Sequence, residues 1–417
     1  MRLNRIKGLL VLLSTIAVLA LSANLALAEE NKMDFGGSFE VRAISQAKNS
    51  DFLFGEPSST EVVPLGAGLN FRGDLAFTPA DQVAAKLRLG YKTDSTMQTD
   101  STTQTGSTLP PAPNVTFTLD RGYIDFTPNS LLSLRVGKQR LAWGTGYAWN
   151  PTDLLDLPRT AFTAEDDPEG VVAFRGDLAL GPVTGQVFLV PSTDPGSDWE
   201  KSGRAVRFKA SPSAVDLTAG WVKHGTDPAA VTGDFAYSLS GVGLHGEVLY
   251  QSEGNPRADK ATKDVINYLV GADYNFPGGY YLAVEYYHND TAFKDVPELL
   301  SYLGQVKDKY IASGNVTGYP AFMQEYLAGL IGNGGATRDH LFVRGSKTFK
   351  EKYTAELMAV YNPTDGSVEA QPRLEYAWGQ NTTLFVQGLL VNAGKKEAEA
   401  NLIPLRNRLD VGMKVSF

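Results

Sequence analysis

Residues 408–417 read Arg-Leu-Asp-Val-Gly-Met-Lys-Val-Ser-Phe and form the most regular pattern in the sequence. Apolar side chains occupy every second position from Leu409 to Phe417, and the positions between them are polar or glycine. Successive side chains of a β-strand point to opposite faces, so this period of two predicts a strand with one apolar and one polar face. In a strand that crosses a membrane, lipid covers the apolar face and water covers the polar face.

The alternation recurs upstream, in residues 69–77, 83–92, 280–287 and 353–362. Alternating segments of about ten residues are typical of strands in membrane barrels. A soluble β-sandwich also contains alternating strands, because its two apolar faces pack against each other. The alternation by itself therefore leaves both folds open.

The connections between these segments favour the barrel. Short connections alternate along the chain with longer polar ones, such as residues 93–114 and 289–339. Membrane barrels have short periplasmic turns and long extracellular loops, whereas a sandwich does not need this alternation. The short connections are expected at Pro79 to Asp81, Pro128-Asn129, Gly181-Pro182, Ser211 to Ala214, Pro277 to Gly279, Lys350-Glu351 and Gly379 to Asn381.

The sequence thus predicts an all-β fold, a transmembrane antiparallel β-barrel over residues 29–417. We count 18 strands, with both termini in the periplasm. The count falls to 16 if Thr232 to Leu239 and Val368 to Trp378 are not strands.

Residues 1–28 have the features of a signal peptide. Three basic residues, Arg2, Arg5 and Lys7, precede an apolar run over residues 9–21. This run is shorter than the ~20 residues that a membrane-spanning helix needs. Residues 26–28 read Ala-Leu-Ala, which fits the small-x-small rule for cleavage after Ala28. We therefore expect the chain to be exported.

Composition excludes several classes of protein. Removal of the signal peptide takes away three basic residues and no acidic ones, which lowers the formal net charge from −8 to −11. No nucleic-acid partner is expected, because such a partner requires a basic surface. The absence of cysteine excludes disulfides, thiolate metal sites and covalently attached c-type haem.

Two motifs resemble known families. A C-terminal alternating strand that ends in Phe417 resembles the assembly signal of Gram-negative outer-membrane barrels. The segment Arg135-Val136-Gly137-Lys138-Gln139, followed by Trp143-Gly144, resembles Gram-negative porins, in which Gly-Lys/Arg-Gln follows the fifth strand. This resemblance implies an outer-membrane location, assembly by the barrel-assembly machinery and contact with outer-membrane lipid.

In porins of this kind, the loop after the fifth strand folds into the lumen and narrows it. The resemblance implies this role for residues 141–170, and the apolar residues Trp143, Trp149 and Leu155 suit a packed loop better than a solvated one. The alternative is a loop that lies over the rim of the barrel. The acidic residues of this candidate constriction loop are Asp153, Asp156, Glu165, Asp166, Asp167 and Glu169.

A basic wall is expected opposite this acidic loop. The lumen-facing positions of the early strands carry Arg42, Arg72, Lys86, Arg88 and Arg135. Opposed sets of charge would place a transverse field across a narrow aperture, and charged rings are how pores discriminate among ions. The alternative is that these charges only reflect the polarity of any water-filled lumen.

The long connection 289–339 has the periodicity of helices. Leu299 and Leu303 belong to one apolar stripe and Phe322 to another, and Pro297 stands at a first-turn position. Two short helices are therefore expected in this extracellular loop. They would form either a lid over the outer mouth or a docking surface for a partner.

No enzyme, cofactor or metal site is expected. The four histidines are His224, His245, His288 and His340, and no pair has the spacing of metal ligands or of a nucleophile and its base. The chain also lacks a glycine-rich phosphate loop.

The leading functional prediction is a porin-like channel for the diffusion of small hydrophilic solutes or ions, because a barrel of 16 to 18 strands leaves an aqueous lumen. One alternative is a barrel sheath around a separate partner, such as a multihaem cytochrome. Another is an exporter of an anionic polymer. The sequence leaves open whether the chain forms a homo-oligomer or binds a periplasmic or extracellular protein partner.

Overall fold

The computed structural model describes most of the chain beyond the expected signal peptide, which lies outside the described residues. The described residues are 32–48, 53, 62–80, 83–94, 114–156, 162, 170–192, 199–253, 263–332, 334–402 and 405–417.

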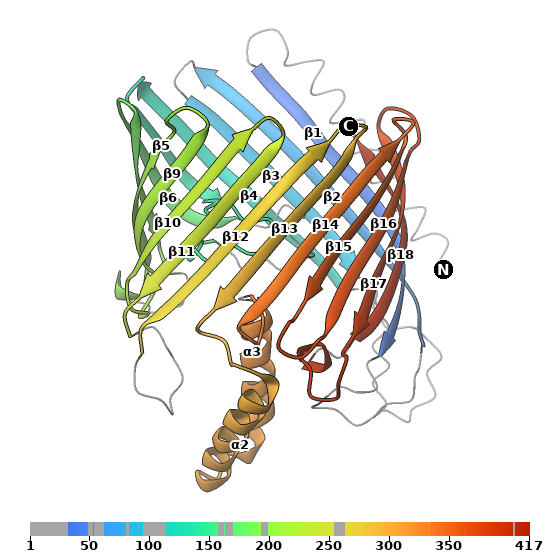
Figure 1. Cartoon of the computed structure of the whole chain (residues 1–417). Coiled ribbons are helices and arrows are strands. Elements are labelled where there is room, and N and C mark those ends of the chain that lie inside the picture. The colour runs from blue at the N-terminus through green and yellow to red at the C-terminus, as the bar shows by residue number, and fades with distance from the viewer. Residues whose placement is uncertain are drawn as a thin grey trace.

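The described chain forms one sheet of 18 strands, as predicted (Figure 1). The first nine strands are β1 (Lys32–Lys48), β2 (Val62–Ala80), β3 (Val83–Asp94), β4 (Asn114–Asn129), β5 (Leu132–Gln139), β6 (Val171–Leu180), β7 (Val183–Val190), β8 (Gly203–Ala210) and β9 (Val215–Lys223). The others are β10 (Ala230–Leu239), β11 (Val242–Gln251), β12 (Val265–Phe276), β13 (Tyr280–Asn289), β14 (Asp339–Phe349), β15 (Tyr353–Tyr361), β16 (Val368–Ala377), β17 (Thr382–Asn392) and β18 (Leu405–Ser416). The two segments that the sequence leaves uncertain are strands β10 and β16.

Each strand pairs antiparallel with the next one in the chain, and the last strand closes the ring. Strand β18 pairs with β1 over an extended register in which Ser416 lies opposite Ser38 and Asp410 lies opposite Ile44. The sheet is therefore a barrel in which every described strand has a partner on both sides. Closure satisfies the backbone hydrogen bonds that a strand in lipid could not otherwise make.

Short and long connections alternate around the barrel and gather at opposite ends, as the sequence predicts (Figure 1). Ser130 and Leu131 join β4 to β5, and Gly181 and Pro182 join β6 to β7. At the other end, residues 140–170 join β5 to β6 and residues 290–338 join β13 to β14. The C-terminus lies at the end with short connections (Figure 1).

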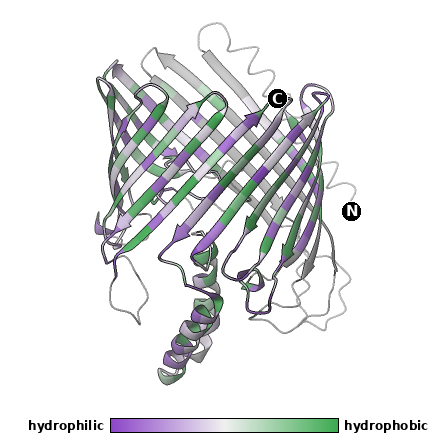
Figure 2. Ribbon diagram, in the orientation of Figure 1, coloured by the Kyte–Doolittle hydropathy of each residue, from purple (hydrophilic) through white to green (hydrophobic). Residues whose placement is uncertain are grey.

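The two faces of the sheet differ in the way the alternation predicts. On β18, Leu409 and Val411 are about half exposed on the outside of the barrel, whereas Asp410 between them is 2% exposed and points inward. On β13, Leu282 is exposed and Glu285 is fully buried. Figure 2 shows the resulting alternation of hydrophobic and hydrophilic residues along the strands. Apolar side chains thus face the lipid, and polar side chains face the lumen.

The predicted helices form a hairpin in the connection between β13 and β14. They are α2 (Val296–Ala312) and α3 (Tyr319–Gly332), and the short 3-10 helices of the described chain are η1 (Trp199–Lys201), η2 (Val316–Gly318) and η3 (Glu399–Leu402). Helix α2 begins where the Asp295 side chain accepts a hydrogen bond from the backbone N–H of Glu298, at 2.9 Å. No helix in the described part of the chain is long and apolar enough to cross a membrane.

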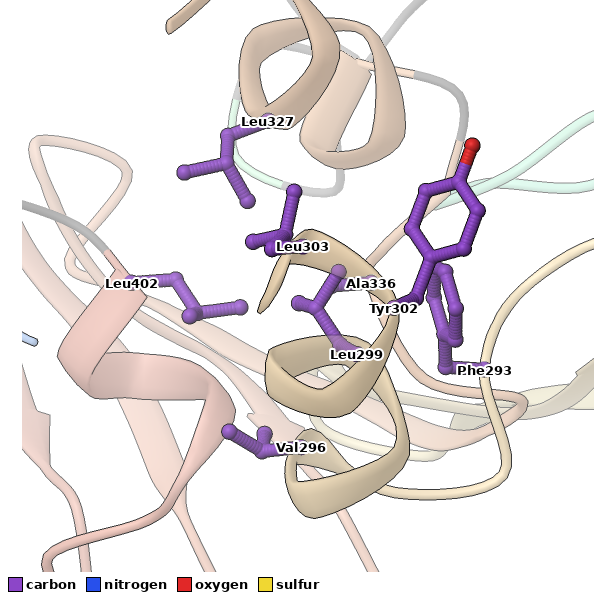
Figure 3. Packing of buried hydrophobic residues seen from close by; sticks show 8 residues of the cluster. All are labelled: Phe293, Val296, Leu299, Tyr302, Leu303, Leu327, Ala336 and Leu402. Atoms are coloured by element: carbon purple, nitrogen blue, oxygen red, sulfur yellow. The ribbon is translucent and has the colours of Figure 1, made fainter. Parts of the chain in front are cut away.

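The helical hairpin extends away from the barrel at the end with long connections (Figure 1). Its base packs on residues from the rim, since Leu402 of η3 belongs to the same buried cluster as Leu299 and Leu303 of α2 (Figure 3). The buried cluster consists of Phe293, Val296, Leu299, Tyr302, Leu303, Leu327, Ala336 and Leu402. The predicted stripe through Leu299 and Leu303 is therefore the face that fixes the hairpin to the barrel.

Candidate pore constriction

The chain leaves the barrel wall after β5 and continues as residues 140–156, which we call the inner segment. At its root, Gln139 is fully buried and donates a hydrogen bond to the carbonyl of Ala173 on β6, at 2.9 Å. From this point the inner segment makes two groups of contacts with the luminal wall. The first group lies on β6–β9 and the second on β11–β14.

The first group of contacts is apolar. Trp143 packs edge-on against Phe188 of β7, with 5.1 Å between the ring centroids, and the guanidinium of Arg207 on β8 lies 5.2 Å from the Trp143 ring. The cluster around them contains Leu141, Trp143, Leu155, Ala173, Phe188, Ala205 and Val222. Burial of these side chains removes apolar surface from the water of the lumen. The two ends of the inner segment are therefore held against β6–β9.

The second group is polar and centres on Glu247 of β11. Its carboxylate accepts hydrogen bonds from the backbone N–H groups of Thr145 and Gly146, at 2.6 and 2.7 Å, and from the Thr152 hydroxyl at 2.7 Å. Gly144 has a φ of 83°, and a Cβ there would lie 2.5 Å from the Glu247 carboxylate. The glycine of the Trp-Gly motif is thus needed where the backbone passes this side chain.

Glu285 of β13 binds the next two residues of the inner segment. It accepts hydrogen bonds from the backbone N–H groups of Tyr147 and Ala148, at 2.5 and 2.8 Å. The Tyr147 hydroxyl also donates to Asp273 of β12, at 3.0 Å. Charge-assisted bonds of this kind are stronger than neutral ones.

Trp149 completes the attachment to this far wall. Its ring stacks on Tyr287 of β13, with 5.2 Å between centroids, and meets Phe342 of β14 edge-on at 6.3 Å. Strands β11 to β14 lie six to nine positions from β5 in the ring of 18. The contacts of the inner segment therefore extend along the luminal face of the wall, on β6–β9 and on β11–β14.

The predicted acidic residues fall into two groups. Asp156 accepts hydrogen bonds from the backbone N–H groups of Leu141 and Ala142, at 3.2 and 3.3 Å, and Asp153 accepts one from Trp143 at 3.3 Å. These two carboxylates shape the inner segment itself. Glu165, Asp166, Asp167 and Glu169 lie outside the described residues.

The predicted basic residues lie on strands β1 to β5. Arg42 forms an ion pair with Glu40 at 3.2 Å. Arg135 forms an ion pair with Asp125 at 2.5 Å, and its guanidinium lies 4.1 Å from the Tyr123 ring centroid. Their described partners are thus on the wall and not on the inner segment.

Three further basic residues are placed by strand register. Lys86 lies opposite Tyr123 of β4, Arg88 lies opposite Arg121 of β4, and Arg72 lies opposite Ser38 of β1. The side chains of Arg72 and Arg88 are outside the described part of the structure.

Sequence reasoning did not identify Glu247 and Glu285 as the residues that hold the inner segment. The alternation over residues 280–287 puts Glu285 on the polar face of its strand, but it says nothing about what a luminal carboxylate binds. Three histidines also lie beside carboxylates, as in the 2.7 Å contact of His245 with Glu285. The described residues contain no group of three or more His, Cys, Asp or Glu arranged to hold a metal ion.

A closed antiparallel barrel with apolar side chains outside and polar side chains toward the lumen is the architecture of the porin class. The family of Gram-negative porins matches residues 15–317, and the chain belongs to this family. It is accordingly a porin-like channel of the outer membrane, and the family is one of channels and not of enzymes.

Porins are among the solved structures that the comparison returns. A triple mutant of the Rhodopseudomonas blastica porin is 12% identical, covers 92% of this chain and 100% of its own, and has a TM-score of 0.45. A structure described as "Asymmetric conductivity of engineered proteins" is 12% identical, covers 93% of this chain and 100% of its own, and has a TM-score of 0.44. Among curated proteins, none matches the sequence significantly.

Proposed function

We propose that this porin is a channel for the diffusion of small hydrophilic solutes, and that the inner segment sets its aperture. The observation that carries the proposal is the attachment of the inner segment to Glu247 and Glu285, on the wall opposite its root. A segment held at both sides of the lumen reduces the cross-section through which solutes pass.

The contacts of the inner segment lie on β6–β9 and β11–β14, and one buried cluster also joins Ala148 and Trp149 to Met358 of β15. Strand β10 lies between the two groups, so the wall left to face the aqueous path consists of β16–β18 and β1–β5. Several arginines of this wall are paired with carboxylates two residues away. Arg373 lies 2.7 Å from Glu375, and Arg408 lies 2.7 Å from Asp410. A paired charge presents a dipole to a passing ion and not a net charge, so we expect the channel to discriminate only weakly between anions and cations. Lys86, Arg72 and Arg88 should give this weak selectivity a preference for anions.

The two alternatives are less well supported. A sheath for a multihaem cytochrome needs a clear lumen, and the inner segment occupies part of it. An exporter of an anionic polymer needs a continuous basic track. The ion pairs of Arg42, Arg135 and Arg373 interrupt such a track with carboxylates.

The test is the single-channel conductance of the purified protein in planar bilayers. Replacement of both far-wall carboxylates, Glu247→Gln with Glu285→Gln, should release the inner segment and give a larger, noisier conductance. Glu356→Gln is the matched control, because Glu356 is a luminal carboxylate of β15 whose described partner is Arg344, at 2.6 Å. If the double variant conducts as the wild type does, the inner segment does not set the aperture.

A further inference from the structure

A groove on the outside of the barrel crosses strands β16, β17, β18 and β1, and we call it the lipid-facing groove. Its volume is about 450 Å³, which is within the range of pockets that hold small molecules. Leu374, Leu390 and Leu409 line it, and these side chains are between 50% and 61% exposed on the outer surface. The groove is therefore continuous with the apolar surface that faces the lipid.

Two neighbouring residues with little side chain form the floor of the groove. The strand register places Gly388 of β17 across from Pro372 of β16, and a Cβ at Gly388 would have the Pro372 ring, at 3.4 Å, as its nearest neighbour. Proline has no N–H to donate, and the pairing of β16 with β17 skips Gln371 and Pro372. The surface is therefore low at this point, and the larger leucines stand around it.

The groove carries no uncompensated charge in the described part of the chain. Arg373 and Arg408 belong to its lining, but each guanidinium is paired with a carboxylate that faces the lumen. The partners are Glu375 and Asp410, each at 2.7 Å. An uncharged, largely apolar groove in a lipid-facing wall suits a hydrocarbon chain, because burial of a charged ligand there would leave its charge unpaired.

Asn407 adds a hydrogen-bond donor at the extracellular end of the groove. It is the third residue of β18 and is exposed on the same face as Leu409. Its side-chain oxygen accepts a hydrogen bond from the Val391 N–H at 3.2 Å, so its amide nitrogen remains as a donor, and no acceptor for it lies among the described residues. A polar group in lipid requires a partner. The carbonyl that links an acyl chain to a lipid headgroup is such an acceptor.

We propose that the lipid-facing groove binds one fatty acyl chain of an outer-leaflet lipid, and that the carbonyl of this chain accepts a hydrogen bond from Asn407. The chain runs from Asn407 over Gly388 and Pro372 toward the middle of the bilayer. A second barrel fits the groove less well, because the backbone carbonyls of its strands are used in its own sheet and cannot accept from Asn407. The site lies outside the channel and does not depend on how solutes pass through it.

The experiment titrates the full-length barrel in detergent micelles with dimyristoylphosphatidylcholine, and native mass spectrometry counts the lipids retained on each barrel. The wild type should retain one lipid at concentrations about tenfold below those at which further lipids bind. Gly388→Leu should bind this lipid at least about tenfold more weakly, because the new side chain displaces several methylene groups of the acyl chain from the groove.

An ether-linked phosphatidylcholine with the same chain length tests the hydrogen bond, because it has no carbonyl. The wild type should bind this ether lipid about two- to tenfold more weakly than the ester lipid, which corresponds to the loss of one ordinary hydrogen bond. Asn407→Leu cannot donate, so it should bind the two lipids equally. A groove that only collects hydrocarbon would not distinguish them in either protein.

Gly185→Leu is the control, because it adds the same side chain to the outer surface of β7, where the nearest heavy atoms to a new Cβ lie 3.6 Å away. This variant should retain the lipid as the wild type does. Heat-modifiable migration of each variant verifies that the barrel has folded.

Three results would overturn the proposal. The wild type could retain no distinct lipid, folded Gly388→Leu could retain it equally well, or the wild type could bind the ester and ether lipids with the same affinity. If Gly388→Leu instead changes the number of barrels in each complex and leaves the lipid count unchanged, the groove holds a second copy of the chain and not a lipid.

Discussion

His245 of β11 and Glu285 of β13 lie 2.7 Å apart beneath the inner segment, although 40 residues separate them in the chain. Glu285 therefore accepts the histidine N–H in addition to the backbone N–H groups of Tyr147 and Ala148. Both oxygens are in use, and the imidazole fixes the orientation of the carboxylate. The Glu285 carboxylate is thus held by the wall in the orientation that accepts hydrogen bonds from the backbone of the inner segment.

Replacement of Glu285 with Gln should loosen the inner segment without unfolding the barrel. The amide keeps one acceptor oxygen but loses the charge, which weakens bonds worth about 1.5–3 kcal/mol each. The chain has no cysteine, so a single Ala148→Cys substitution at this fully buried position reports local opening. Thiol labelling should be at least about tenfold faster in Glu285→Gln.

Ala142→Cys provides the control for this measurement, because Ala142 is exposed in the same segment. Its labelling rate should not respond to Glu285→Gln. Equal labelling of Ala148→Cys in both backgrounds would show that Glu285 does not hold the segment closed.

Gly144→Ala should weaken the attachment of the inner segment to the wall by changing the backbone of the segment itself. A φ of 83° is unfavourable for alanine, and the new Cβ would lie 2.5 Å from the Glu247 carboxylate. The comparison is Gly181→Ala, where φ is 70° and no atom lies within 4 Å of the new Cβ. In urea titrations both variants should lose about 1–2 kcal/mol from the backbone conformation. Only Gly144→Ala should also change the conductance.

The barrel was predictable from the sequence, whereas the attachment of the inner segment was not. The alternation in β18, the turn at 181–182 and the apolar stripe of α2 are local patterns. Each can be recognised by comparing a residue with its near neighbours in the sequence. The bond from Thr145 to Glu247 joins residues 102 positions apart, and no local pattern marks either one. The Arg135–Asp125 pair lies between these two cases in predictability, because its residues are on neighbouring strands joined by a single short turn.

The two faces of the sheet should tolerate charge very differently. Val270 of β12 is 52% exposed on the outside, and Val270→Arg should cost about 2–4 kcal/mol if the residue lies near the bilayer midplane. Ser346 of β14 faces the lumen opposite Glu356, so Ser346→Arg should cost less than about 1 kcal/mol. Urea titrations in lipid vesicles measure both changes. Equal costs would contradict the assignment of the faces.

Acid should weaken the contacts of the outer loops through Glu399. Burial would raise the pKa of this carboxyl, but the His340 imidazole and the hydrogen bonds from Thr337 and Ala336 lower it overall. Because the pKa is lower in the folded state, the stabilisation is present above the unfolded value of about 4.3 and is lost as the pH falls through the folded value. The stability difference between the wild type and Glu399→Gln should therefore be largest near neutral pH.

The measurement is thermal unfolding of both proteins over a range of pH. The difference between them should stay constant from neutral pH to about 5 and shrink at lower pH. A difference that grows on acidification would mean that the pKa of Glu399 is raised in the folded state.

Loss of Phe417 should impair closure of the barrel. Its backbone N–H donates to the carbonyl of Gly37 at 3.0 Å, and its carbonyl accepts from the Gly37 N–H at 2.9 Å, so the last residue forms part of the β1–β18 seam. Deletion removes both hydrogen bonds together with a side chain that is 47% exposed on the outside. The yield of folded protein in outer-membrane fractions should fall.

Phe417→Ala separates the two contributions, since it keeps the backbone bonds and removes only the ring. If the machinery that assembles barrels reads the aromatic side chain, Phe417→Ala should lower the folded yield nearly as much as the deletion does. If the seam is decisive, Phe417→Ala should assemble as the wild type does. Phe349→Ala is the control, because Phe349 is 46% exposed at the end of β14, away from the seam. An unchanged yield after deletion of Phe417 would contradict both explanations.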